Sequence, residues 1–78
     1  MNLELNKSIE AKRLNKRTLA PTADPEVPIP YGAIVENVES VGDFDRFMYL
    51  REMYRCTHTL LASATDPKAW REMVKASS

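Results

Sequence analysis

Apolar and polar side chains alternate most clearly in the middle of the chain, between residues 33 and 57. Three short runs there are rich in β-branched or aromatic residues and are separated by turn residues. The runs occupy residues 33–39, 44–50 and 53–57. This pattern predicts three strands, joined by a hairpin loop at 40–43 and a tight turn at 51–52. Because both connections are short, we expect an antiparallel meander.

The first of these runs departs from strict alternation. A regular strand places Ile34, Glu36 and Val38 on one face. Val35 and Asn37 then lie on the opposite face, so apolar side chains point both ways. We therefore expect a β-bulge near Glu36.

Two helical segments are predicted after the strands. Residues 58–64 fit a single helical or 3₁₀ turn that packs Leu60 and Leu61 onto the end of the sheet. Thr65, Asp66 and Pro67 then form a helix start, because an Asp or Thr cap and a proline at or near the first helical position favour one. The apolar stripe of this helix comprises Trp70, Met73 and Val74.

The first thirty residues carry a weaker pattern. Residues 1–20 are polar and basic, and they fit a frayed tail, a short helix from Ser8 or an edge strand at 16–20. Residues 21–30 hold four of the chain's five prolines. Proline fixes φ and restricts the preceding residue, so this tract is predicted to be an extended linker or a polyproline-type segment along an aromatic groove.

Length and composition narrow the function classes. A chain of 78 residues makes one small domain, and 44% hydrophobic content is too high for a disordered one. Eleven Lys and Arg balance eleven Asp and Glu, and this zero net charge makes nucleic-acid binding an unfavoured function. No signal-peptide pattern is present and no apolar run approaches the roughly 20 residues that span a bilayer, so we expect a cytoplasmic protein with no membrane partner.

The run from Ile29 to Tyr49 combines features that occur together in one family. They are Pro30, Gly32 and Val35 at its opening, then Gly42, Phe44, Phe47 and Tyr49 in the second strand. Over about residues 29–61 the chain resembles the bacterial SH3-like (SH3b-type) small β-barrel. The resemblance implies a barrel of about five strands and a peptide-binding role, although no ligand-binding residue carries over.

The expected fold class is mainly β: a small antiparallel SH3-like barrel with a short C-terminal helix and a flexible N-terminal arm. The expected units are a polar arm at residues 1–20, a Pro-rich linker at 21–30, the barrel at 31–64, and a helix and tail at 65–78. Only three barrel strands are visible, so the remaining strands are expected from residues 15–28 or from another chain.

Cys56 and His58 are the residues that most suggest chemistry. In a strand they point to one face, as a nucleophile and its base or as half a metal site would. A domain this thin has little room to exclude water around such a site. We therefore expect Cys56 to be a small buried hydrophobe and His58 a surface or capping side chain, with no catalytic residue, metal or cofactor. The carboxylates expected to face water are Glu36, Glu39, Asp43, Asp45 and Glu52.

Aromatic residues give the strongest functional lead. Phe44 and Phe47 are expected to fill a common core. The rings expected to bind a partner are Tyr31, Tyr49, Tyr54 and Trp70, since exposed rings line the peptide grooves of SH3-like domains.

We therefore expect an interaction module without catalytic activity that docks a peptide, a partner protein or a second copy of itself as a homodimer. One alternative is a small-barrel nucleic-acid-binding protein that uses the basic arm. Its cations are Lys7, Lys12, Arg13, Lys16 and Arg17. A further alternative is a thiol enzyme built around Cys56.

Overall fold

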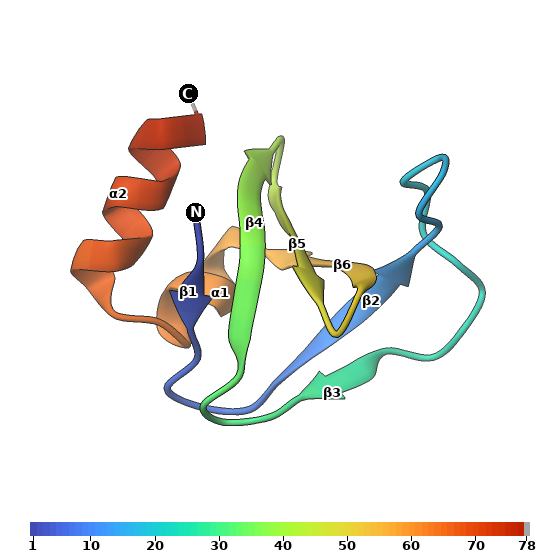
Figure 1. Ribbon diagram of the computed structural model, residues 1–78, viewed down its shortest axis with the longest axis horizontal. Helices are drawn as coiled ribbons and strands as arrows, with labels where there is room; N and C mark the ends of the chain where they lie inside the picture. Colours follow the sequence, from blue (N-terminus) through green and yellow to red (C-terminus); the bar gives the residue numbers. More distant parts are fainter. Residues whose placement is uncertain (78) are drawn as a thin grey trace.

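The computed structural model describes residues 1–77, which form six strands and two helices. The strands are β1 (Leu3–Glu4), β2 (Ile9–Leu14), β3 (Val27–Ile29), β4 (Ile34–Val41), β5 (Phe44–Tyr49) and β6 (Glu52–Thr57). The helices are α1 (His58–Ser63) and α2 (Pro67–Ser77). Every pairing between the strands is antiparallel, which confirms a mainly β fold with a short C-terminal helix (Figure 1).

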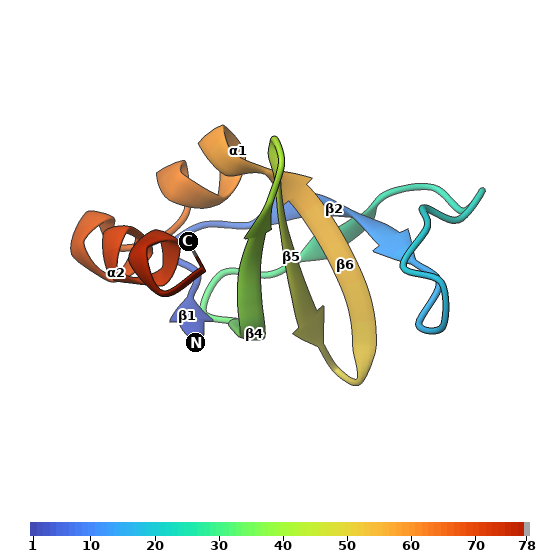
Figure 2. The same cartoon turned by 90° about the horizontal axis from the view of Figure 1, so that it is seen from above.

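The strands form one sheet in the order β1-β4-β5-β6-β2-β3. Within residues 1–77, β1 and β3 are the edge strands of this open sheet. The strands that the sequence pattern left unassigned come from residues 3–14 and 27–29 of this same chain. The helices lie at one end of the sheet, away from the connection between β2 and β3 (Figure 2).

Residues 3–4 and 9–14 form strands of the sheet, whereas the sequence pattern predicted a flexible arm over residues 1–20. β1 pairs with β4, and Leu3 and Leu5 are buried. β2 pairs with both β3 and β6 and buries Ile9 and Ala11 in the core. The charged residues Glu10, Lys12 and Arg13 stand between the buried residues of β2, and they concealed the strand in the sequence pattern.

A bulge interrupts β4 between Glu36 and Glu39, as expected. Asn37 adopts a φ of 52° there, a left-handed conformation that asparagine tolerates better than most residues. Two consecutive residues, Glu36 and Asn37, therefore face solvent. The extra residue turns Val35 and Val38 to the same buried side, which differs from the regular alternation assumed for this strand.

The core lies between one face of the sheet and the two helices. We call this the inner face; it carries Phe47, which is fully buried, and α1 and α2 contribute Leu61 and Met73. Phe44 is only half-buried and lies outside this core, contrary to expectation. Residues three apart in a strand point to opposite faces, so Phe44 and Phe47 cannot share an interior.

The Pro-rich tract is only partly a linker. Val27–Ile29 forms β3, which pairs with β2 and buries Ile29. Pro28 lacks an N–H, and an edge strand accommodates it because one side of that strand needs no donor.

Candidate functional site

The four aromatic residues expected to bind a partner occupy different environments. Tyr54 is buried, and its ring stacks on that of Phe47 with 6.0 Å between centroids. Trp70 packs partly buried against the core from α2, and Tyr49 is half-buried at the end of β5. Tyr31 is 75% exposed in the turn before β4. No ring contact joins any two of the four in residues 1–77.

Asp45 on β5 is fully buried, although the sequence pattern placed it among the solvent-facing carboxylates. Its Oδ1 atom accepts a hydrogen bond from Ser40 Oγ at 2.9 Å, and its Oδ2 atom accepts one from Trp70 Nε1 at 3.2 Å. His58 Nδ1 also contacts Oδ1. Asp45 shares the inner face with Phe47, so it lies where α1 and α2 meet the sheet. The carboxylate therefore joins β4, α1 and α2.

His58 bridges this carboxylate to the β4–β5 turn. Its Nε2 atom lies 2.7 Å from the carbonyl oxygen of Gly42, and its side chain is 32% exposed. Both ring nitrogens thus face acceptors, an arrangement that the doubly protonated imidazolium satisfies best. The pKa of His58 is raised above its usual value, chiefly by the Gly42 carbonyl and also by Asp45, while desolvation opposes the rise.

Ser40, His58 and Asp45 are the residue types of a serine hydrolase triad, but their geometry is different. In a triad the serine hydroxyl meets His Nε2 while the carboxylate holds Nδ1. Here Ser40 Oγ bonds to Asp45 and lies 3.4 Å from His58 Nδ1, and Nε2 is occupied by a backbone carbonyl. The cluster therefore holds elements together and does not activate the hydroxyl.

Cys56 is buried in β6, as expected, directly across from Asp45. Burial, together with the Asp45 charge, raises the pKa of this thiol to about 12, although a hydrogen bond with the Leu61 backbone lowers it in part. A thiol protonated at neutral pH is a poor nucleophile.

The opposite, outer face of the sheet carries a groove. Phe44 and Arg55 form its wall, with the Arg55 guanidinium carbon 4.2 Å from the centre of the Phe44 ring. On one side a groove of about 620 Å³ extends from this pair to Leu60 of α1 and to Pro21. On the other side a pocket of about 100 Å³ is lined by Leu14, Leu19 and Val41 as well as the pair. We call the larger space the Phe44–Arg55 groove.

Charged residues cross this outer face in register. Glu39, Arg46, Arg55 and Lys12 stand opposite one another on β4, β5, β6 and β2. Arg46 donates to Glu39 across the two strands at 2.7 Å. Lys12 Nζ donates to the Asp24 carbonyl oxygen at 2.6 Å, but within residues 1–77 neither Lys12 nor Arg55 forms an ion pair. We call Arg46, Arg55 and Lys12 the cationic row.

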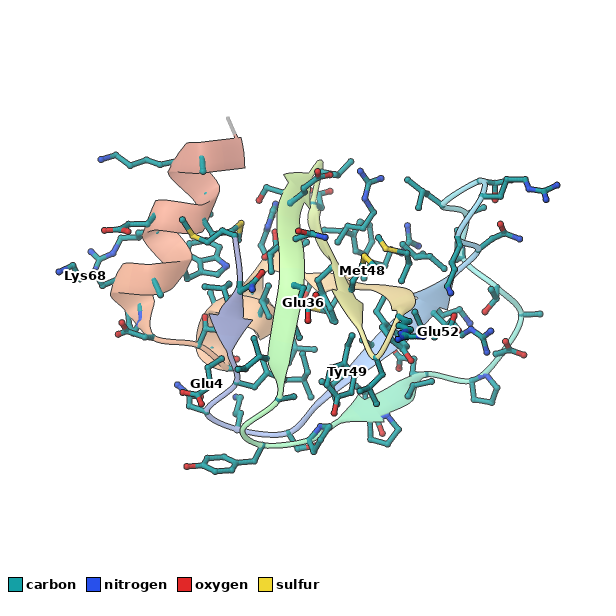
Figure 3. All side chains as sticks on the ribbon, viewed as in Figure 1. Glu4, Glu36, Met48, Tyr49, Glu52 and Lys68 are labelled. Carbon is teal, nitrogen blue, oxygen red and sulfur yellow. The ribbon has the colours of Figure 1, made fainter. Side chains whose placement is uncertain are left out.

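Beyond the cationic row the outer face is apolar again. Met48 and Met53 are cross-strand neighbours, and both are half-buried. Met48 lies beside Glu36 on the neighbouring strand (Figure 3). Apart from Lys12, which was named for the nucleic-acid alternative, none of these outer-face residues was identified by sequence reasoning as a site. Met48 lies two residues from Arg46, and Met53 lies two residues from Arg55. This spacing was the feature of the sequence that could have placed them on one face of the sheet.

The basic residues of the N-terminal segment are dispersed. Arg13 lies 3.5 Å from Glu52 and 3.8 Å from Asp24, and Lys16 lies 3.7 Å from Glu52. Their charges are thus partly balanced at the surface, where each such pair contributes little stability.

Comparisons with protein-family models, curated proteins and solved structures found no match to this chain. They give no support to the SH3-like resemblance, which stays a prediction. None of the helices within residues 1–77 has the length and apolar character needed to cross a bilayer. The same residues place no group of three or more His, Cys, Asp or Glu side chains suitably for a metal ion.

Proposed function

We propose that the chain is a non-enzymatic interaction module that docks an extended segment of a partner protein in the Phe44–Arg55 groove. The observation that carries this proposal is the position of Phe44. It lies outside the core, half-buried beside a guanidinium, as the wall between two hollows. Aromatic and arginine side chains beside a pocket are the residues that most often dominate protein binding.

The lining of the groove favours a peptide over other ligands. Apolar contacts come from Phe44 and Leu60, while Glu10 and Glu26 stand at its rim with Lys12. A mixed rim around an apolar centre is typical of protein interfaces. A nucleic-acid strand crossing the same face would bring its phosphates against carboxylates on both sides of the cationic row.

Nucleic-acid binding through the basic N-terminal residues stays the alternative. Their pairing with Glu52 and Asp24 weakens it, because the paired cations offer less net charge to phosphates. A second copy as the partner and a cytoplasmic location likewise stay predictions. Size-exclusion chromatography with light scattering tests the homodimer directly.

Selection of phage-displayed random peptides on the immobilised full chain tests the proposal. Affinities of the enriched peptides are then measured for the original chain and for Phe44→Ser. We expect this variant to weaken binding about tenfold or more, as loss of a dominant interface residue does. Tyr31→Ser is the matched control, because it removes an exposed ring outside the groove.

Thermal unfolding of each variant establishes that it is folded before binding is compared. Loss of peptide binding in Tyr31→Ser with retention in Phe44→Ser would move the docking surface elsewhere. Failure to enrich any peptide, together with retardation of a single-stranded oligonucleotide at low salt, would replace the proposal by the nucleic-acid alternative.

A further inference from the structure

The like charges of the cationic row destabilise the isolated chain. Side chains directly opposite each other on neighbouring strands have Cβ atoms about 4.5–5.5 Å apart, and like charges there are destabilising. Arg55 stands opposite a cation on both sides, Arg46 on β5 and Lys12 on β2. The only carboxylate that pairs with the row in residues 1–77 is Glu39, at one end of it.

On β5 and β6, the rows on either side of these cations carry no charged side chain. Along β5 and β6 the outer face presents Phe44 opposite Thr57, then Arg46 opposite Arg55, then Met48 opposite Met53. Successive rows on one face of a strand are two residues apart, about 6.6 Å. On these two strands, uncharged and cationic rows therefore alternate at the spacing of every second residue in an extended peptide.

We propose that the partner segment has the pattern apolar-x-acidic-x-apolar, with its carboxylate at the cationic row and its apolar side chains beside Phe44 and beside Met48 and Met53. This inference rests on the proposed function and extends the site along the outer face, because Met48 and Met53 lie outside the lining of the Phe44–Arg55 groove. The carboxylate supplies the counter-charge that Arg55 lacks. Because the pattern reads the same in both directions, either orientation of the peptide satisfies it.

Three synthetic peptide libraries test this pattern. Each has capped ends and the form x-Leu-x-Z-x-Leu-x, with x drawn from Ala, Ser and Thr, and with Z as Glu, Gln or Lys. Binding to the full-length ¹⁵N-labelled chain is followed by amide chemical shifts. We expect the Glu library to bind about tenfold more tightly than the Gln library, since a hydrogen-bonded charge pair contributes more than a neutral pair. The Lys library should bind least.

Two changes, in salt concentration and in the charge at Arg55, distinguish a charge interaction with the peptide from apolar contact alone. Raising NaCl from about 50 to 500 mM should weaken binding of the Glu library and leave that of the Gln library nearly unchanged, because salt screens exposed charges. Arg55→Gln should remove the preference for Glu over Gln. Arg71→Gln on α2 is the matched control and should retain the preference, since Arg71 lies outside the groove.

The possible failures are distinguishable. Equal binding of the Glu and Gln libraries, still dependent on Phe44, would overturn the acidic pattern and leave the docking proposal intact. Absence of binding by all three libraries would contradict the docking proposal itself. Tighter binding of a single-stranded oligothymidylate than of the Glu library, at equal salt, would overturn both.

Discussion

The two faces of the β5–β6 hairpin come from the same stretch of alternating sequence but have opposite environments. On the inner face, Asp45, Phe47, Tyr54 and Cys56 are all buried. On the outer face, Phe44, Arg46, Met48, Met53 and Arg55 are all half-buried. Both sets mix apolar with polar residues, so composition alone does not separate them. What separates them is whether each polar group has a partner.

Inner-face polar groups are satisfied within the chain. Ser40, His58 and Trp70 all contact the Asp45 carboxylate, and no buried side-chain polar atom of the described residues lacks a hydrogen-bond partner. Arg55 on the outer face contacts the Phe44 ring, but no carboxylate of residues 1–77 forms an ion pair with it. A fully satisfied face stabilises the fold, whereas an incompletely satisfied one is available for binding.

The largest expected effect is on stability, from truncating the two phenylalanines. Phe47→Ala should lower the free energy of unfolding by about 3–5 kcal/mol, as loss of a fully buried ring does. Phe44→Ala should cost only about 1 kcal/mol, because that ring is half exposed. Urea denaturation measures both variants. Equal costs would contradict the assignment of Phe44 to the outer face.

The next effect concerns the buried carboxylate. Asp45→Ala should destabilise the chain by about 2–3 kcal/mol, because Trp70 Nε1 and its neighbours lose their acceptor. Asp45→Asn retains one acceptor oxygen and should cost less. Tryptophan fluorescence during urea unfolding reports both the stability and the environment of Trp70. A cost below that of Phe44→Ala would show that the cluster does not hold the helices to the sheet.

A smaller effect is the pH dependence that His58 confers. Because the pKa of His58 is raised in the folded chain, its stabilising contribution is complete below the unfolded value of about 6.5 and disappears as pH rises through the folded value. Melting temperatures measured between about pH 6 and 8.5 should therefore converge for the original chain and His58→Gln as pH rises. If the two melting temperatures diverged as pH rises, protonation of His58 would destabilise the fold instead of stabilising it. Since the chain has a single histidine, NMR titration assigns the effect without ambiguity.

The smallest expected change in stability comes from the cationic row. Arg55→Gln should leave the free energy of unfolding within about 0.5 kcal/mol or raise it slightly, because it removes a like-charge contact with Arg46 and Lys12. Urea denaturation at low salt measures this change. A clear loss of stability would mean that Arg55 stabilises the folded chain and that the charges of the cationic row are already neutralised within it.

Sequence reasoning located the strands where alternation is strong and failed where it is weak. β5 and β6 were predicted almost to the residue, and the bulge in β4 was inferred from the break at Glu36. β2 was missed because its three charged residues equal its three buried apolar residues in number and mask the alternation that marks a strand. Burial of Asp45 was missed because only tertiary contact, with α1 and α2, supplies its donors. The outer groove likewise depends on residues distant in sequence, such as Pro21 and Leu60.

The most direct test is a map of amide chemical-shift changes across the chain as a selected peptide is added. The account predicts the largest changes at Phe44, Arg55 and Leu60, around the groove. Changes centred instead on Tyr31 and the pocket between β1 and α2 would contradict it, because that surface lies outside the groove.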